Sequence, residues 1–325
     1  QEVMAAAEKA GADLEFEAAV AGAIPIIRPL KQSMAGNRIS EVMGIVNGTT
    51  NYILTKMSEK GMDYAEALAQ ATELGYAEAD PTADVEGYDA GRKMAIMASI
   101  AFNSRVTFPQ VYTEGITKIS ADDIRYAKEF GYVIKLLGLA RNTPEGIEVK
   151  VHPMLIDENH PLAGVKDAFN AVFVHADAMD DAMFMGRGAG QMPTASAVMG
   201  DVVDVMRNLV QYVDVCIANE EDADKVFGIK APNNNVESGK LNKSGYEHVA
   251  KEICEQFGCK KVAITLRESI NASRNGWSGM IYDAAGIANY STHYDIDIVD
   301  RVGGGDSFTG AMIYSLITGK DDKNV

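Results

Sequence analysis

Cysteine and histidine are scarce in this chain, and neither residue type forms a recognisable site. The three cysteines, Cys216, Cys254 and Cys259, all follow residue 210 and lack the paired C-x-x-C spacing of zinc or redox motifs. The five histidines include no H-E-x-x-H pattern. We therefore expect reduced, structural thiols, and the sequence does not indicate transition-metal catalysis.

Positive charge is also in the minority. Lysine and arginine number 30 against 46 aspartates and glutamates, which gives a formal net charge of -16. Non-specific affinity for nucleic acid comes largely from cationic side chains that displace counterions, so we expect no nucleic-acid partner. The best apolar runs, Ala18 to Ile27 and Met94 to Phe102, are shorter than the roughly 18 residues of a membrane span. We therefore expect no membrane association.

Targeting and nucleotide-binding signatures are absent as well. Gln1 opens directly into a helical pattern, without a basic region or an initiator methionine. We expect a cytoplasmic protein whose upstream piece is missing. No G-x-G-x-x-G turn follows a first strand, and no Walker A motif occurs. A dinucleotide-binding domain is therefore expected to be cut away, and any ATP site must be of another kind.

The first two thirds of the chain mix helical and strand patterns. Amphipathic periodicity predicts helices at residues 1–12, Thr49–Lys60, Tyr64–Leu74, Val85–Phe102 and Ala195–Arg207. A further helix is predicted to begin at Ser120. Alternating or apolar runs predict strands at Leu14–Glu17, Ile39–Val46, Tyr132–Ala140, Ile147–His152, Ala171–His175 and Ala182–Met185. Strands that share one sheet over these helices give an α+β arrangement with a mixed sheet.

The pattern changes after the helix that ends near Arg207. Val213–Ile217 suits a buried parallel strand, and helices and strands then alternate up to a last helix from Asp306 to Ile317. This alternation predicts a partial α/β domain with three layers. The 325 residues have room for two domains, so we predict one domain over residues 1–208 and another over residues 209–325.

A lysine surrounded by acids forms the first candidate site. Asp89 and Lys93 are four residues apart on a predicted helix, so their side chains lie on one face. Alone, this spacing is typical of an exposed salt bridge. More negative charge surrounds the lysine than one ion pair needs, from Glu78, Asp80, Asp84 and Glu86. Such a cluster suits a substrate ammonium group, and the lysine can protonate an alkoxide as hydride reaches a carbonyl carbon. This is dehydrogenase chemistry.

The run from Gly75 to Lys93 resembles the homoserine dehydrogenase family. Further similar segments in the same order and spacing extend the resemblance over residues 1 to about 208, at Glu17–Pro25, Gly44–Tyr52 and Gly186–Ala195. The resemblance implies NAD(P)-dependent interconversion of aspartate 4-semialdehyde and homoserine. It implies that Lys93 is the proton donor, with Asp84 in support, and that residues 1–208 form a homodimer.

The same resemblance implies ligands for particular residues. The amino-acid substrate is expected at Glu78, Asp89, Gly48 and Thr49. The nicotinamide cofactor is expected against Gly75, Gly188 and Gly190. A monovalent cation, Na⁺ or K⁺, is expected on backbone carbonyls of Glu17, Val20, Gly22 and Ile24, and oxygen donors suit a hard cation. Ordinary turns are the alternative for the glycines. A further lysine of the family belongs to the absent cofactor domain.

A glycine-rich run forms the second candidate site. Gly303, Gly304 and Gly305 precede Asp306 at the start of a predicted helix, where backbone N–H groups and the helix dipole favour an anion. The alternative is a plain glycine loop capped by Asp306. Together with Ala218–Ala223 and Ala263–Ser269, the run resembles the ribokinase-like PfkB sugar kinases over residues 209–325. The resemblance is closest to kinases of 2-keto-3-deoxygluconate.

The kinase resemblance implies that Asp306 is the catalytic base and that the three glycine amides form the anion hole. It further implies Mg²⁺ near Asn219 and Asp222, and ATP near Thr265 and Arg267. Asp222 stands where a glutamate is more usual, and the N-terminal half of such a kinase, which builds the sugar pocket, is absent.

Homoserine dehydrogenase is the main interpretation, because the segment that resembles it is longer and keeps the expected proton donor and substrate acids. One alternative is a PfkB carbohydrate kinase that phosphorylates 2-keto-3-deoxygluconate with ATP. Another is an inactive chimeric or truncated product, joined near residues 207–212, that acts only as an interaction surface.

Overall fold

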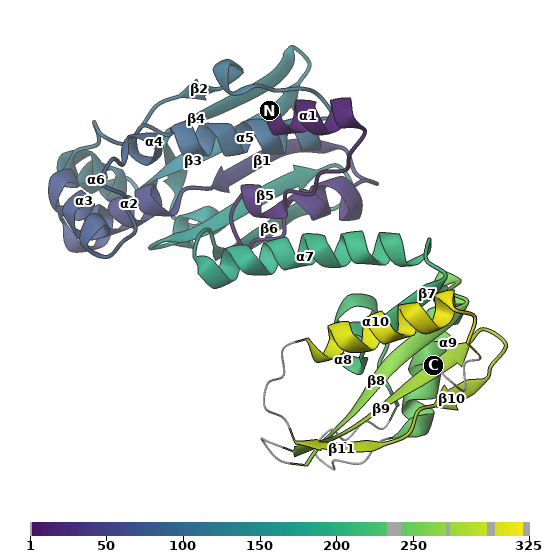
Figure 1. Cartoon of the computed structure of the whole chain (residues 1–325). Helices are drawn as coiled ribbons and strands as arrows, with labels where there is room; N and C mark the ends of the chain where they lie inside the picture. Colours follow the sequence, from purple (N-terminus) through teal and green to yellow (C-terminus); the bar gives the residue numbers. More distant parts are fainter. Residues whose placement is uncertain (1, 233–241, 271–273, 298–302, 321–325) are drawn as a thin grey trace. The chain divides into compact units, whose positions relative to one another are not determined.

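The computed structural model describes residues 2–232, 242–270, 274–297 and 303–320. The chain divides into two compact units, Gln1–Asp201 and Val202–Val325. Each unit has its own sheet and its own hydrophobic core, as Figure 1 shows for the sheets.

Within its described residues, the first unit is built on a six-stranded sheet with the order β2-β4-β3-β1-β5-β6. The strands are β1 (Ile39–Ile45), β2 (Tyr112–Thr113), β3 (Tyr132–Thr143), β4 (Gly146–Asp157), β5 (Phe169–Ala176) and β6 (Asp180–Arg187). β2 pairs with β4 in parallel, and the other neighbours are antiparallel. The sheet is therefore mixed, and the predicted α+β class is confirmed.

Helices pack on one face of this sheet (Figure 1). They are α2 (Gly48–Lys60), α3 (Tyr64–Glu73), α4 (Thr82–Val85), α5 (Tyr88–Ala101) and α6 (Ala121–Glu129), while α1 (Glu2–Ala10) buries no residue. Their core joins Ile53 and Met94 to strand residues Val42 and Val151. A Cβ at Gly138 of β3 would lie 2.2 Å from Met94 Cγ, so this glycine allows α5 to pack closely on the sheet.

The opposite face of the same sheet carries a smaller core. Ile45, Leu137 and Ala171 pack there with Leu162 of the 3-10 helix Pro161–Gly164. Phe173 of β5 lies beside this core and is only half-buried. Part of this face is therefore apolar and accessible.

The second unit is a three-layer α/β structure, as predicted. Helix α7 (Gln191–Val210) precedes a sheet with the order β10-β9-β8-β7, and β11 also pairs with β9. Its described elements are β7 (Val215–Ala218), α8 (Glu220–Asp222), α9 (Lys243–Phe257), β8 (Lys261–Ser269), β9 (Arg274–Asp283), β10 (Ala288–Tyr290), β11 (Tyr294–Asp297) and α10 (Gly304–Ile317). β7 and β8 are parallel. Ile253 of α9 packs with Ile264, whereas Met312 of α10 packs with Ala263, so the two helices cover opposite faces.

Two local expectations from the sequence are wrong. Leu14–Glu17 forms no strand, because the Glu17 carboxylate accepts hydrogen bonds from nearby backbone N–H groups and the chain turns there into a short 3-10 helix. The helix expected from Val85 begins only at Tyr88, because Gly87 adopts a left-handed conformation with φ of 77°. The other predicted helices and strands are present with shifted ends. No helix among the described residues is long and apolar enough to cross a membrane.

Candidate active site

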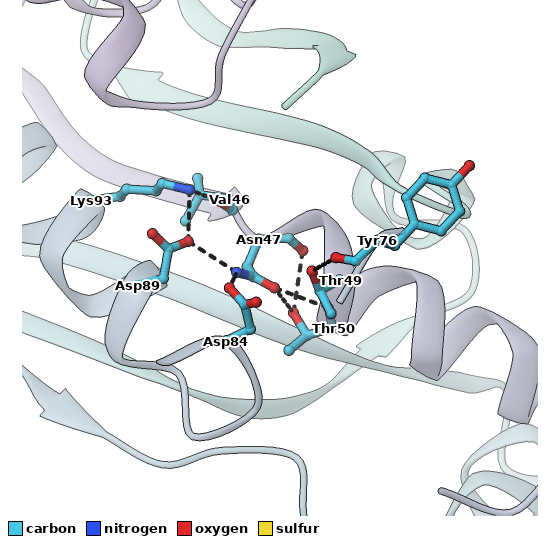
Figure 2. A network of polar contacts seen from close by, with 8 residues as sticks. All are labelled: Val46, Asn47, Thr49, Thr50, Tyr76, Asp84, Asp89 and Lys93. Atoms are coloured by element: carbon cyan, nitrogen blue, oxygen red, sulfur yellow. Dashed lines mark hydrogen bonds and ion pairs between the residues drawn. The ribbon is translucent and has the colours of Figure 1, made fainter. Parts of the chain in front are cut away.

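Two aspartates, a lysine and an asparagine meet where β1 ends and α5 begins (Figure 2). Lys93 Nζ lies 2.7 Å from Asp89 Oδ2 and 3.0 Å from the carbonyl oxygen of Val46. Asn47 Nδ2 donates to Asp84 Oδ1 at 2.6 Å and to Asp89 Oδ2 at 2.9 Å. We call these five residues, Val46, Asn47, Asp84, Asp89 and Lys93, the acid–lysine cluster.

Local structure places each of these side chains. Asn47 is the N-cap of α2, and its Oδ1 accepts a hydrogen bond from Thr50 N at 2.9 Å. The amide nitrogen of Asn47 therefore remains available for the two aspartates. Gly87 separates the short helix that carries Asp84 from α5, whose first turn carries Asp89. Lys93 follows one turn later on the same helix face.

Burial changes the acidity of Asp84 in the acid–lysine cluster. Burial raises the pKa of the Asp84 carboxyl, the hydrogen bond from Asn47 acts in the opposite direction, and the charge of Asp89 raises the pKa further. The side chains of Lys93 and Asp89 are 20% and 31% exposed. A lysine ammonium has three N–H donors. Two of them are directed at Asp89 and Val46, which leaves one N–H that no described residue accepts.

The other residues expected to bind substrate lie around this cluster with different degrees of contact. Thr49 Oγ1 donates to the carbonyl oxygen of Tyr76 at 2.5 Å. Gly48 begins α2, next to Asn47. Glu78 is exposed and makes no hydrogen bond with the described residues, although its charge contributes to raising the pKa of Asp84. The structure thus brings Asp84, Asp89 and Lys93 together and leaves Glu78 outside the hydrogen-bonded cluster.

Asn47 is the candidate that the sequence pattern did not reveal. The pair Asn47-Gly48 after a strand indicates a turn. In the structure the asparagine links two acids from different helices. Its position directly before an amphipathic helix is a signal for an N-cap, but nothing in the sequence shows which groups the free amide nitrogen reaches.

The glycines expected against a dinucleotide lie on two segments. Gly75 follows α3 with φ of 75°, and Gly190 precedes α7 with φ of 125°. A Cβ at Gly188 would lie 2.1 Å from Nδ2 of Asn170, so the bare backbone at 188 covers this side chain. Asn170 is 1% exposed, and neither of its polar side-chain atoms has a hydrogen-bond partner in the described structure. The absence of a side chain at Gly188 thus lets the backbone of this segment lie directly against Asn170.

The residues expected to hold a monovalent cation form one buried turn, with Glu17, Val20, Gly22 and Ile24. The carboxylate of Glu17 accepts hydrogen bonds at 2.6–2.8 Å from the N–H groups of three successive residues, 26 to 28. The carboxylate of Glu17 is therefore occupied, and the backbone carbonyl of Glu17 is the group expected to bind a cation. Ala21 and Gly22 are successive left-handed residues, and a Cβ at Gly22 would lie 2.4 Å from the carbonyl oxygen of Gly188. Carbonyl oxygens in such a tight turn fit a hard cation.

The kinase-like residues of the second unit lie on separate elements. Gly303, with φ of 84°, precedes Gly304 and Gly305 at the start of α10, and Asp306 is exposed in the first turn. Thr265 and Arg267 lie on β8. Asn219 and Asp222 cap each other's backbone N–H groups at 2.8 and 3.1 Å. No group of three or more His, Cys, Asp or Glu that could hold a metal occurs among the described residues, which exclude 298–302.

Two family models match the chain. A model described as homoserine dehydrogenase matches residues 25–203, and a model described as pfkB family carbohydrate kinase matches residues 174–325. The homoserine dehydrogenase of Corynebacterium glutamicum is 58% identical over 214 residues, which are 64% of this chain and 48% of that protein. The homoserine dehydrogenase of Bacillus subtilis is 50% identical over 208 residues, with the same two shares. The chain thus spans about half the length of these curated relatives.

Solved structures match over the same part of the chain. A homoserine dehydrogenase from Thiobacillus denitrificans has a TM-score of 0.62 and 51% identity, covering 63% of this chain and 48% of that one. A hyperthermophilic archaeal homoserine dehydrogenase in complex with NADPH has a TM-score of 0.55 and 27% identity, covering 64% and 60%.

Proposed function

Because the chain belongs to the homoserine dehydrogenase family, we propose that its acid–lysine cluster serves the NAD(P)-dependent interconversion of L-aspartate 4-semialdehyde and L-homoserine. The observation that carries this proposal is the position of Lys93. Its ammonium is fixed by Asp89 and Val46 and has one N–H donor that no described residue accepts, and the Lys93 side chain is 20% exposed. Relatives that share this segment at 50–58% identity are homoserine dehydrogenases.

The chemistry needs a proton donor and an acidic surface. In the direction of reduction, Lys93 Nζ donates a proton to the aldehyde oxygen, which becomes the hydroxyl of homoserine. NAD(P)H, when bound, supplies the hydride to the carbonyl carbon. Asp89 holds the ammonium of Lys93 in place, and the carboxylates of Asp84 and Glu78 attract the ammonium group of the substrate. Gly75, Gly188 and Gly190 are the positions proposed to face the cofactor.

The test separates substrate binding from turnover. We expect L-homoserine to bind the chain by calorimetry, and we expect its oxidation with NAD⁺ or NADP⁺ to be visible in nicotinamide absorbance. Lys93→Met should lower kcat by about 10²–10⁴-fold, the usual contribution of a general acid. Lys118→Met, which removes an exposed lysine of the same unit, should leave kcat unchanged. Equal rates for the two variants, or a chain that binds no homoserine, would contradict the proposal.

A monovalent cation and a second copy of the chain complete this proposal. The buried turn with Glu17, Val20, Gly22 and Ile24 is the proposed site for Na⁺ or K⁺. The accessible apolar part of the sheet face around Phe173 supports a homodimer through residues 1–208, because such a surface is stabilised by burial. A cytoplasmic location stays a prediction of the same resemblance.

The second candidate function is phosphoryl transfer from ATP to 2-keto-3-deoxygluconate, favoured by the kinase model that matches residues 174–325. In this candidate function Asp306, in the first turn of α10, is the proposed base that takes a proton from a substrate hydroxyl, and the amides of Gly303 to Gly305 are the proposed anion site. The side chains of Asn219 and Asp222 accept hydrogen bonds from each other's backbone N–H groups, which argues against a Mg²⁺ site at these residues. ADP formation that requires the sugar acid and disappears in Asp306→Asn is the expected result. Absence of both activities would favour an inactive chimeric product.

A further inference from the structure

Lys135 of β3 is a buried cation that the proposed chemistry does not use. Its residue is 2% exposed. Its ammonium donates to Asn51 Oδ1 at 2.9 Å and to the carbonyl oxygen of Val165, and no carboxylate of a described residue accepts from it. Burial disfavours a charged amine, and at this position the hydrogen bonds to Asn51 and Val165 offset part of that cost.

Asn51 connects this lysine to one short segment, residues 165–169. Its Nδ2 lies 2.9 Å from the carbonyl oxygen of Asp167 and 3.1 Å from that of Phe169, with Val165 at 3.3 Å. The side-chain amide nitrogen of Asn51 thus lies near three carbonyl oxygens, while its side-chain oxygen accepts a hydrogen bond from Lys135. Buried hydrogen bonds of this kind restrict the movement of the elements that they join.

Helix α2 holds the same segment at two further points. Asp167 N donates to Thr55 Oγ1 at 3.1 Å, and Asp167 Oδ1 lies 2.8 Å from Lys56 Nζ. Asp167 adopts a left-handed conformation with φ of 53°, which a non-glycine residue keeps only when its surroundings enforce it. The segment 165–169 therefore has one defined position against α2.

This position reaches the proposed substrate site through Gly48. A Cβ at Gly48 would lie 2.9 Å from the carbonyl oxygen of Ala168, so the segment touches bare backbone at the start of α2. Asn47, Asn51 and Thr55 are spaced by four residues and share one side of the helix. Asn47 bonds to Asp84 and Asp89, whereas Asn51 and Thr55 bond to segment 165–169. One buried polar stripe thus joins the acid–lysine cluster to Lys135.

We propose that Lys135 and Asn51 are positioning residues that fix the turn Asn47–Thr49 for the amino-acid substrate by holding segment 165–169 against it. The identity of the substrate in this statement rests on the proposed function. The positioning itself rests on the hydrogen bonds and on the contact at Gly48.

The charge of Lys135 offers a direct way to observe this link. Burial, and then the charge of Lys166, lower the pKa of Lys135 to about 8, while the carboxylates of Glu59 and Asp167 act in the opposite direction. Lys56 of α2 is a further cation bound to Asp167. In the folded state Lys135 loses its proton well below the pH at which an unfolded lysine does, so its contribution to stability improves as pH rises above about 8.

The first experiment needs no variant. In wild-type protein, the amide NMR signals of Asp167, Phe169 and Gly48 should shift together with an apparent pKa near 8. Titration at Asp167 and Phe169 without any response at Gly48 would overturn the proposal, because the segment would then not act on the turn.

The second experiment compares Lys135→Met with Lys60→Met, which removes an exposed lysine in the last turn of α2. Lys135→Met should abolish the titration at Gly48 and weaken L-homoserine binding at least tenfold by calorimetry, whereas Lys60→Met should preserve both. Unchanged homoserine affinity in Lys135→Met would overturn the proposal. If Gly48 titrates in wild type but the chain binds no homoserine, the positioning holds and the assigned substrate is wrong.

Discussion

Asp80 and Asp84 lie four residues apart, yet their surroundings shift their acidities in opposite directions. Burial raises the pKa of Asp84, with a further contribution from the charge of Asp89. Hydrogen bonds from the side chain and backbone of Thr82 lower the pKa of the exposed Asp80. The difference follows from where the chain turns after α3, because only Asp84 points into the acid–lysine cluster.

This contrast predicts opposite effects of two matched substitutions. The folded-state pKa of Asp84 lies above its unfolded value, so ionised Asp84 costs stability at neutral pH. Asp84→Asn should therefore raise the midpoint of thermal unfolding at neutral pH, and the gain should disappear below about pH 4. Asp80→Asn should lower the midpoint at neutral pH, with a loss that also fades in acid. Circular dichroism melts across this range check both signs, and shifts in the same direction would contradict the account.

Part of the candidate site was predictable from single residues. The spacing of Asp89 and Lys93 places them on one helix face, and their ion pair is present. Asn47 was not predictable as a link, because its two partners lie 37 and 42 residues away and the sequence pattern carries no information about such contacts. The sequence likewise does not show that the side-chain amide of Asn170 lacks hydrogen-bond partners among the described residues.

At the scale of elements, the buried carboxylate of Glu17 stabilises a turn where the sequence pattern predicts a strand. Leu14 to Glu17 alternates as a strand does, but Glu17 binds the N–H groups of residues 26 to 28 and donates its own N–H to Asp201 Oδ2 at 2.9 Å. Arg28 Nη2 lies 2.9 Å from the other oxygen of Asp201. Long-range hydrogen bonds thus override a local pattern over four residues.

The hydrogen bonds of this turn predict that replacing Glu17 with the nearly isosteric glutamine lowers the stability of the fold strongly. Glu17→Gln replaces one acceptor oxygen with an N–H₂ group facing backbone donors, which leaves buried N–H groups unpaired. We expect a loss of about 2–3 kcal/mol in the free energy of unfolding, measured by urea denaturation. Glu15→Gln is the control, since Glu15 is exposed and should change stability by less than about 0.5 kcal/mol. Similar losses in both variants would show that the buried turn is not the cause.

Long periodic elements were the most predictable. α2 and α3 each have an amphipathic pattern that ends at a glycine, and their existence needs no knowledge of the rest of the fold. The order of the first sheet was beyond the sequence, because β1 lies between β3 and β5 through pairings that join residues about a hundred or more positions apart. Gly87 was not predictable as a helix boundary, because the sequence pattern continues through it. In the structure its left-handed φ separates α4 from α5.

At the scale of the whole chain, two sheets each have a separate hydrophobic core. Ile53 belongs to the core of the first unit and Ile253 to that of the second. The single tryptophan, Trp277, lies on β9 of the second unit. Its fluorescence therefore reports on the unfolding of the second unit.

Ile253→Ala should lower the unfolding midpoint followed by tryptophan fluorescence, because a buried isoleucine truncated to alanine costs about 2–5 kcal/mol. Ile53→Ala should leave this fluorescence midpoint in place and lower a transition seen by calorimetry. Both residues are 0% exposed, so the two substitutions are matched. A fluorescence midpoint that moves equally in both variants would mean that the chain unfolds as one cooperative body.

The contact between Gly22 and Gly188 also limits how this chain can change by mutation. A methyl group at Gly22 would lie 2.4 Å from the backbone carbonyl oxygen of Gly188. A methyl group at Gly188 would collide with the side chain of Asn170, which is itself buried. A saturation library screened only for expression should therefore be depleted of replacements at Gly22 and Gly188. Gly36 and Gly164, which have open space around them, should accept most residues.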